Sequence, residues 1–385
     1  MGGGVRDALL GQPVHDWDLE VFGLEADDLA TVLARVGRVD AVGKAFGVLK
    51  VRPRGHRGLD IDVSLPRRDS KVGPGHRGIL AQGDPHLDPT EAARRRDLTV
   101  NAMAVVLPEG HLFDPFGGQR DLQARVLRAV DPTTFLDDPL RALRAARFAA
   151  QLGFQATDDL IALAASAELG ELPPERIFTE LQRLLTEGSR PDLGWAFLRS
   201  ADLDVRLFPA CARPPGLPET FLRCLPERDA IDIPGRRLLF MLAIWLHPSP
   251  PPAWLDAFDR LGLHKWGAYP ARRKAEALVG TPEAPIASDA DLRRLSTRCE
   301  AGLWLGVRAA WDPSGPWADA LTRCRMLGVA HEAPAPVLLG RHLTGRVPPG
   351  PAMGMLLERA YGAQLHGDIV TLDDALAWLD RSLSP

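Results

Sequence analysis

The spacing of hydrophobic residues along the chain changes near residue 130. Before that point, short runs alternate or cluster β-forming residues as strands do: WDLEVFGL, FGVLKVR, LDIDVSL and ARVLRAV. After it, apolar residues recur at three- and four-residue steps in DDPLRALRAARFAAQLGF, DDLIALAASAELG, ERIFTELQRLLTEG and DLGWAFLRSADL, as in amphipathic helices. The pattern therefore predicts an α+β head followed by an all-helical remainder.

The length of the chain and its proline-rich stretches predict several domains. At roughly 150 residues per domain, 385 residues make two to four domains. The stretches ARPPGLPE, HPSPPPAW and VPPGPAMG interrupt the helical part. We therefore expect a head in residues 1–130 and helical domains in residues 131–204, 205–300 and 301–385.

Composition limits the class of protein. Charged residues of both signs make up 25% of the chain, which favours a folded protein over a disordered one. The formal net charge of -4 gives no overall attraction for nucleic acid, so any such surface must be local. The four cysteines form no CxxC pair, which argues against a disulfide framework or a structural zinc site. Without a signal peptide or a membrane-spanning run, the sequence predicts a cytoplasmic protein.

Two pairs of aspartates are the first candidates for chemistry. Asp16 and Asp18 lie in one strand-like run, and Asp60 and Asp62 lie in another. Residues two apart in a strand project to the same face, so one pair can bind a hard cation and an adjacent strand can supply a third carboxylate. Two metal ions held in this way assist substitution at phosphorus, and Mg²⁺ is the expected ion. Taken alone, such a pair is more typical of a half-exposed strand.

A glycine-rich stretch, GGGVRDALLG, comes directly before the first aspartate pair. It predicts a turn that leads into a short helix, and the first turn of a helix offers free N–H groups to a phosphate. The stretch lacks the glycine spacing of a dinucleotide-binding site. A glycine turn is more often only a turn, but its place before the aspartates favours a phosphate site.

Six segments together resemble the motifs of the class II tRNA nucleotidyltransferases, the CCA-adding enzymes and their bacterial poly(A) polymerase relatives. They are GGGVRDALLG, HDWDLEV, RRRDLTVNAMA, DPFGGQRDL, DDPLRALRAARFAAQLGF and PERIFTEL, and they span roughly the first 200 residues. The resemblance implies a nucleotidyltransferase head, with a mixed sheet and flanking helices, followed by all-α neck, body and tail domains. It also implies template-independent transfer of CMP and AMP from CTP and ATP to the 3′ end of tRNA, with contacts to the acceptor stem. It implies no membrane partner and leaves the oligomeric state open.

The resemblance also assigns roles to individual residues in the head. Asp16 and Asp18 fall on metal ligands and Asp62 on the third catalytic carboxylate, whereas Asp60 has no counterpart. Contacts with the nucleoside triphosphate are implied at Gly3, Arg6 and Arg96. The nearby residues Asp97 and Asn101 fall in the segment with which the family senses the ribose and holds the head together.

The helix predicted in DDPLRALRAARF offers a way to select bases. Asp138, Arg141 and Arg144 follow at three-residue steps near one face, and Arg147 continues the row. Cytosine and adenine present an amino donor beside an unprotonated ring nitrogen, whereas uracil and guanine present a carbonyl beside an N–H. A carboxylate only accepts and a guanidinium only donates, so Asp138 and Arg141 side by side are complementary to C and A. Arg144 and Arg147 are then expected to neutralise phosphates, although intrahelical ion pairs on a surface helix are the simpler alternative.

The sequence is also compatible with other functions. The family also contains enzymes that add only CC, only A, or a poly(A) tail. The segment from Asp69 to Arg94, which includes the GPGHRG match to the family's mobile loop, has full length and so disfavours a CC-only enzyme. A non-catalytic RNA-binding protein on the same scaffold is a further alternative, since the chain starts at the glycine motif without the strand that precedes it in the family. Three converging carboxylates argue against it, because their repulsion is costly without a cation.

Overall fold

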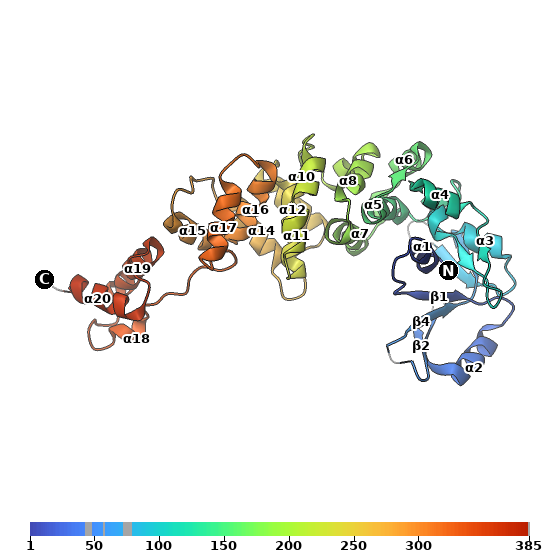
Figure 1. Ribbon diagram of the computed structural model, residues 1–385, viewed down its shortest axis with the longest axis horizontal. Coiled ribbons are helices and arrows are strands. Elements are labelled where there is room, and N and C mark those ends of the chain that lie inside the picture. The colour runs from blue at the N-terminus through green and yellow to red at the C-terminus, as the bar shows by residue number, and fades with distance from the viewer. Residues whose placement is uncertain (43–47, 57, 72–78, 384–385) are drawn as a thin grey trace. The chain divides into compact units, whose positions relative to one another are not determined.

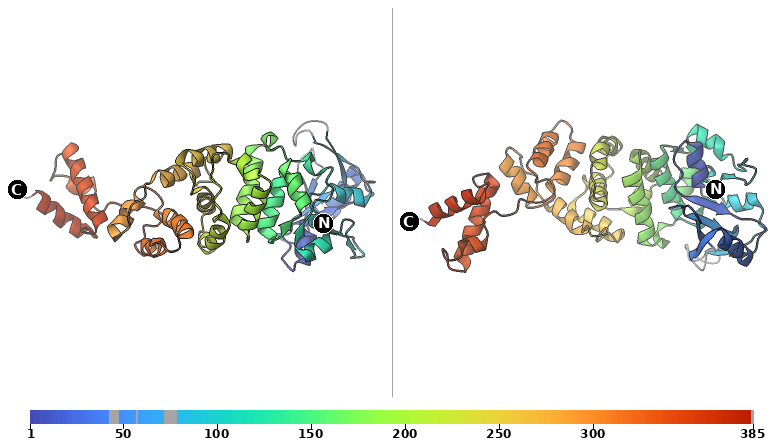
Figure 2. Two further views of the ribbon diagram at one scale, coloured as in Figure 1. Left: turned by 90° about the horizontal axis from the view of Figure 1, so that it is seen from above. Right: turned by 60° about the horizontal axis from the view of Figure 1, so that its bottom comes forward.

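The computed structural model describes residues 1–42, 48–56, 58–71 and 79–383 of the chain. The chain forms two compact units, Met1–Pro209 and Ala210–Pro385, which divide near the boundary predicted at residue 205. In Figures 1 and 2 the long strands all belong to the blue and cyan part of the chain, and the later part is helical. The α+β head and the helical remainder are thus confirmed, while the GPGHRG segment lies outside the described residues.

A mixed four-stranded sheet with the order β1-β4-β3-β2 forms the centre of the head, and only β1 and β4 run parallel. Its strands are β1 (Trp17–Glu20), β2 (Gly37–Val42), β3 (Val48–Pro53) and β4 (Ile61–Ser64). One face is covered by helix α2 (Ala26–Val36), whose Leu29 packs against Val51 of β3 and Val63 of β4. Because side chains alternate along a strand, the residues directly before and after each of these valines point to the opposite face of the sheet. The strand-like pattern predicted β1, β3 and β4, but it did not predict α2.

Short elements complete the head around this sheet. They are α1 (Gly3–Leu9), the hairpin of β5 (Arg67–Lys71) and β6 (Ile79–Gly83), α3 (Pro89–Arg94), the 3-10 helix η2 (Thr99–Asn101), β7 (Ala104–Val105), β8 (Leu112–Phe113), α4 (Gly118–Ala124) and β9 (Val126–Leu127). The ARVLRAV run contributes only the two residues of β9. This strand pairs in parallel with β10 (Gln155–Ala156), which follows the first long helix, and so ties the head to the helices after it.

The long helix α5 (Leu140–Leu152) is the centre of the helical part of the first unit. It packs against α7 (Pro174–Glu187) and α8 (Pro191–Ser200), and α6 (Asp158–Ala165) and α9 (Leu203–Leu207) complete the group. Where α5 and α8 meet, a Cβ atom on Gly194 would lie 2.8 Å from the carbonyl oxygen of Ala146 and 2.9 Å from the Cβ of Ala150. Only glycine therefore permits the observed approach of the two helices.

The second unit is helical, and its helix α12 (Pro234–Leu246) is buried at every residue from Leu238 to Leu246. Its helices are α10 (Leu217–Arg223), α11 (Leu225–Asp229), α12, α13 (Pro251–Arg260), α14 (Ala271–Gly280), α15 (Asp289–Ser296), α16 (Ala301–Trp311), α17 (Trp317–Met326), α18 (Gly340–Leu343), α19 (Pro351–His366) and α20 (Leu372–Leu383). Helix α16 packs against α12 across the boundary predicted at residue 300, so the division of this unit stays a prediction. In the described part of the chain, no helix has the length and apolar character needed to cross a membrane.

We predict that Gly194→Ala destabilises the first unit. The added methyl group meets a backbone carbonyl that cannot move without shifting α5, and such overpacking costs about 1–3 kcal/mol. The measurement is the midpoint of urea unfolding, followed by circular dichroism. Gly170→Ala is the control, because a Cβ atom there meets nothing within 4 Å. Equal midpoints for the two variants would contradict the close helix contact.

Candidate active site

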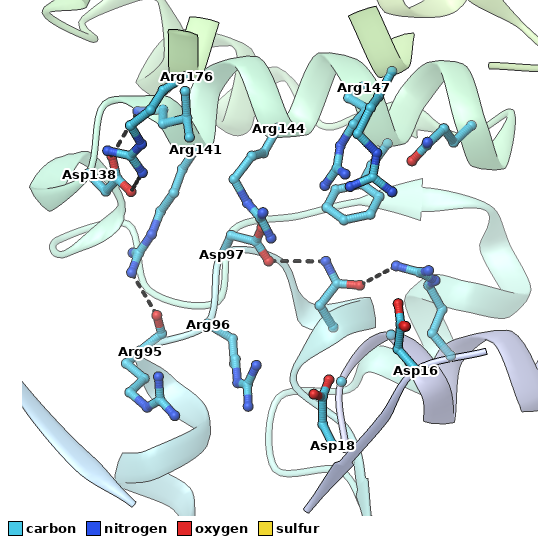
Figure 3. Close-up of a pocket in the computed structure, with 18 residues that line it drawn as sticks. Asp16, Asp18, Arg95, Arg96, Asp97, Asp138, Arg141, Arg144, Arg147 and Arg176 are labelled. Atoms are coloured by element: carbon cyan, nitrogen blue, oxygen red, sulfur yellow. Dashed lines mark hydrogen bonds and ion pairs between the residues drawn. The ribbon is translucent and has the colours of Figure 1, made fainter. Parts of the chain in front are cut away.

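Many charged side chains of the first unit line a pocket of about 490 Å³. Eight arginines and four aspartates line it, so positive charge exceeds negative charge by four. Figure 3 shows Asp16 and Asp18 on one side of the pocket and the arginines of α5 on the other. The lining residues are Gly2, Gly3, Arg6, Asp16, Asp18, Arg95, Arg96, Asp97, Asn101, Asp138, Leu140, Arg141, Arg144, Arg147, Phe148, Gln151, Arg176 and Arg183.

The glycines at the start of α1 let the chain pass close to charged groups. Gly2 has a positive φ of 68°, and a Cβ atom on it would lie 3.6 Å from Nη1 of Arg96. A Cβ atom on Gly4 would lie 3.0 Å from the carbonyl oxygen of Asp16. The glycine turn therefore lies between an arginine and the first aspartate, both of which line the pocket.

The acidic side of the pocket comes from two neighbouring strands. Asp18 lies in β1, directly opposite Asp62 of β4, and Asp16 comes just before β1 begins at Trp17. Burial raises the pKa of Asp18, Arg96 and the N-terminal ammonium group oppose that rise, and Asp62 and Asp16 add to it. Asp62 also lies 3.7 Å from Nζ of Lys50. The structure thus places all three predicted carboxylates in one region, with like charges close to one another.

Whether these carboxylates suit a metal ion depends on their chemistry and their spacing. Carboxylate oxygens are the ligands that Mg²⁺ prefers, and a cation would relieve the repulsion by Asp62 and Asp16, which adds to the effect of burial on the pKa of Asp18. The donor set therefore fits a magnesium ion held by Asp16 and Asp18. Among the described residues, however, no three His, Cys, Asp or Glu side chains are grouped closely enough to hold a metal as they stand. The metal ligands remain a prediction.

A buried carboxylate, Asp97, connects the glycine helix to α5. Its Oδ1 accepts from the amide of Asn101 at 3.0 Å, and its Oδ2 accepts from Arg144 at 2.7 Å. Asn101 in turn accepts from Nη1 of Arg6 at 2.6 Å (Figure 3). Burial opposes ionisation of Asp97, but Arg144, Asn101 and the N–H of Leu98 together hold its pKa below the usual range. Asp97 therefore stays charged and fixes one arginine from α5 and, through Asn101, one from α1.

The arginines of α5 differ in how free they are. Arg147 is almost fully buried and forms an ion pair with Glu180 of α7 at 2.9 Å. Burial lowers the pKa of Arg147 to about 10 although Glu180 opposes this, so the group stays protonated at neutral pH. The ring of Phe148 lies 4.3 Å from the guanidinium carbon of Arg147 and 5.5 Å from that of Arg144. Arg144 is more exposed than Arg147, so a ligand can reach it more easily.

Asp138 and Arg141 do not lie side by side on a helix as the sequence pattern predicted. Helix α5 begins only at Leu140, and Asp138 precedes it with an extended backbone, φ -116° and ψ 102°. The cause is Pro139, because proline disfavours helical backbone in the residue before it. The guanidinium group of Arg141 donates to the carbonyl oxygens of Thr134 at 3.0 Å and Arg95 at 2.7 Å. Both residues nevertheless line the pocket.

Three further arginines that the sequence motifs did not single out also line the pocket. Arg95 donates to the buried carboxylate of Glu20 at 2.6 Å, which links the end of α3 to β1. Arg176 forms an ion pair with Asp138, and Arg183 follows two turns later on α7. Two of the three stand in segments already singled out, Arg95 in RRRDLTVNAMA and Arg176 in PERIFTEL. Their motifs pointed to the site, but no local pattern showed which side chains face it.

The head matches a known family. Residues 1–128, which contain the glycine turn and all three carboxylates, match the family model described as the poly A polymerase head domain. The resemblance predicted from the sequence motifs is thereby confirmed for the head.

Curated relatives extend the similarity beyond the head. The chain is 39% identical over 253 residues to the multifunctional CCA protein of Nitrosococcus oceani, which covers 65% of this chain and 58% of the relative. It is 46% identical over 193 residues to the multifunctional CCA protein of Xanthomonas oryzae pv. oryzae, which covers 48% of this chain and 44% of the relative. The chain thus spans about half the length of the curated relatives that it matches.

Solved structures share the fold along nearly the whole chain. A CCA-adding enzyme in an apo form superposes with a TM-score of 0.74 at 23% identity, covering 99% of this chain and 90% of that chain. The CCA-adding enzyme of Bacillus stearothermophilus in complex with CTP superposes with a TM-score of 0.68 at 24% identity, covering 99% of this chain and 92% of that chain. The CCA-adding enzyme of Thermotoga maritima complexed with tRNA superposes with a TM-score of 0.67 at 23% identity, covering 98% of this chain and 90% of that chain. The fold of the chain is therefore the fold of the CCA-adding enzymes.

We predict that Asp97→Asn lowers the free energy of unfolding at pH 7 by about 1–3 kcal/mol, because buried partners lose a charged acceptor. The folded pKa of Asp97 lies below its unfolded value of about 3.9, so the ionised group stabilises the fold above that pH. The stabilisation is lost as the pH falls through the folded pKa. Urea unfolding should therefore separate the wild type from the variant at pH 7, and the gap should narrow below about pH 4.

The control for this prediction is Asp60→Asn. Asp60 is an exposed carboxylate of the head that also bonds an arginine, Arg52, and its removal should change unfolding little at either pH. A gap between the wild type and Asp97→Asn that stays constant down to pH 3 would show that the charge of Asp97 does not stabilise the fold.

Proposed function

We propose that the protein is a template-independent tRNA nucleotidyltransferase that adds CMP and AMP from CTP and ATP to the 3′ end of tRNA. The main support is the pocket, in which Asp16 and Asp18 face a set of arginines from the head and from α5. The names of the similar proteins agree with this function, since they are CCA proteins and CCA-adding enzymes in complex with CTP, ATP or tRNA. These substrates are cytoplasmic, so we also infer a cytoplasmic enzyme.

The arginines of the pocket suit a nucleoside triphosphate. The pocket is lined by more arginines than aspartates, which suits the negative charge of a triphosphate, and one guanidinium group can bind two phosphate oxygens. Arg96 lies against Gly2 and close to Asp18, so it is well placed to hold the phosphates beside the acidic residues. Arg6 and Arg144, both tied into the Asp97 network, are suited to orient the rest of the nucleotide.

Asp138 and Arg141 retain hydrogen-bonding capacity for a base. Arg141 uses two of its five N–H groups on backbone carbonyls, which leaves others to donate to a ring nitrogen. The carboxylate of Asp138 can accept about four hydrogen bonds, and the structure fills three of these places. An amino group of cytosine or adenine can take the remaining place. Uracil and guanine instead offer a carbonyl there, which the carboxylate repels.

The acidic residues define where the reaction takes place. Asp16 and Asp18 would hold Mg²⁺ and Asp62 would lie beside it, and the bound ion would activate the 3′ hydroxyl of the tRNA and neutralise the leaving pyrophosphate. The residues of the chain contribute by position. Arg96 would keep the phosphates next to Asp18, and Asp138 and Arg141 would hold the base on the other side of the pocket. The 3′ end of the tRNA would then approach the phosphates from the side of the acidic residues.

A substrate panel tests this function. The protein is incubated with tRNA that ends before CCA, before CA or before A, and with each labelled nucleotide separately. We expect CMP on the first two, AMP on the third, and little UMP or GMP on any. Addition of CMP alone or of AMP alone would indicate a CC-only or A-only enzyme, and repeated AMP addition a poly(A) polymerase. Binding of tRNA without any incorporation would indicate a non-catalytic RNA-binding protein.

We predict that Asp16→Ala and Asp18→Ala each reduce incorporation by about a thousandfold or more, because several kcal/mol of charge stabilisation are lost with the cation. Binding of tRNA, measured by fluorescence anisotropy, should stay close to the wild-type value. Asp60→Ala is the control, since Asp60 is paired with Arg52 and has no assigned role. Incorporation within tenfold of the wild type in either variant, with Mg²⁺ supplied, would refute the metal assignment.

We predict that Asp138→Ala reduces selectivity as well as rate. The lost contact should be worth about 1–3 kcal/mol, so kcat/KM for CTP and ATP should fall about ten- to a hundredfold. The values of kcat/KM for UTP and GTP should fall less. Asp137→Ala, one residue away in the 3-10 helix η3 (Phe135–Asp137), should leave the gap between CTP and UTP unchanged. The measurement is kcat/KM for all four nucleotides on tRNA that lacks CCA. An equal drop for all four would show that Asp138 has only a structural role.

A further inference from the structure

The ion pair between Arg176 and Asp138 joins helix α7 to the start of α5 inside the pocket. Nη2 of Arg176 lies 2.9 Å from Oδ2 of Asp138, and Nη1 lies 3.5 Å from Oδ1. Both side chains are partly exposed, at 30% and 20%, and both line the pocket (Figure 3). Arg176 comes from the PERIFTEL segment, and none of the roles assigned above involves it.

The orientation of Asp138 depends on few contacts. Because Pro139 follows it, Asp138 lies outside the helix, and the helical backbone does not fix the direction of its side chain. The carboxylate is held by the N–H of Leu140 at 3.1 Å on Oδ1 and by Arg176 on both oxygens. Without Arg176, a single bond to Oδ1 would remain, about which the carboxylate can turn. A planar guanidinium that faces both oxygens fixes the plane of the carboxylate.

The same ion pair is not needed to hold α7 against α5. The two helices are already joined by the buried pair of Arg147 and Glu180, whose side chains are only 4% and 8% exposed. Leu181, Leu184 and Leu185 of α7 are also buried. The contact of Arg176 with Asp138 therefore adds little to the packing of the helices, and its main effect is on the carboxylate itself.

We propose that Arg176 is a positioning residue for base selection, which fixes the Asp138 carboxylate so that its last free acceptor site faces the amino group of cytosine or adenine. The inference rests on the proposed function, because it assigns a role within base selection by Asp138. Arg176 does not touch the base. It acts by preventing the carboxylate from turning, and a carboxylate that can turn presents its oxygens equally to a correct and an incorrect base.

The test is kcat and KM for all four nucleotides with Arg176→Met, on tRNA that lacks CCA. Methionine keeps much of the apolar stem and removes the guanidinium group. We expect the ratio of kcat/KM between CTP and UTP to fall about tenfold, the effect of one oriented hydrogen bond. Arg176→Lys keeps the charge but not the planar pair of donors, and should recover only part of the ratio. The double variant Asp138→Ala/Arg176→Met should be no less selective than Asp138→Ala alone, because both changes act through one carboxylate.

Two results would overturn this inference. An equal loss for all four nucleotides would mean that Arg176 binds phosphate. A lower KM for CTP with an unchanged ratio would mean that Arg176 competes with the base for Asp138. Arg190→Met is the control, because it removes a comparable ion pair outside the pocket, that of Arg190 with Asp192 at 2.7 Å. This variant should leave the ratio of kcat/KM between CTP and UTP unchanged.

The same assay separates this inference from the proposed function. Wild-type protein that incorporates neither CMP nor AMP would overturn both. Wild-type protein that is active and selective, together with an Arg176→Met variant of the same selectivity, would overturn only the role of Arg176.

Discussion

The buried charge of Asp97 is the interaction on which the arrangement of the pocket depends. A carboxylate that is only 6% exposed is costly unless its oxygens are satisfied, and here Arg144, Asn101 and a backbone N–H satisfy them. These partners come from different elements: Arg144 from α5 and Asn101 from η2, which in turn contacts Arg6 of α1. The need to satisfy this one charge therefore fixes the position of α5 relative to the glycine turn.

The same need explains how so many arginines can share one small pocket. Four of the eight arginines form an ion pair of this kind: Arg95 with Glu20, Arg144 with Asp97, Arg147 with Glu180 and Arg176 with Asp138. Asp97 and Asp138 also line the pocket, whereas Glu20 and Glu180 contact their arginines from outside it. A chain with a formal net charge of -4 thus contains a pocket lined by more arginines than aspartates, a local feature that overall composition does not show.

Local patterns in the sequence predicted the parts of this site that are local in the structure. Alternation predicted β1 with Asp18 and β4 with Asp62, although Asp16 and Asp60 each precede the strand in which they were expected. Helical periodicity predicted α5 with its row of arginines. The surroundings of Asp138 could not be derived in the same way. Its extended backbone was foreseeable from Pro139, but its contact with Arg176 joins residues 38 positions apart and arises from helix packing. Local periodicity does not encode such pairs.

The register between β1 and β4 determines where the acidic site can tolerate an inserted or deleted residue. Asp18 faces Asp62 because the two strands pair in parallel with Trp17 opposite Ile61. Successive side chains point to opposite faces, so a slip of one residue would set an apolar side chain beside Asp62 and still leave a complete ladder of backbone hydrogen bonds. Insertions and deletions are therefore compatible with the site only in the turns that connect these strands. A homologue that gains or loses one residue within either strand would keep the sheet and lose the acidic pair.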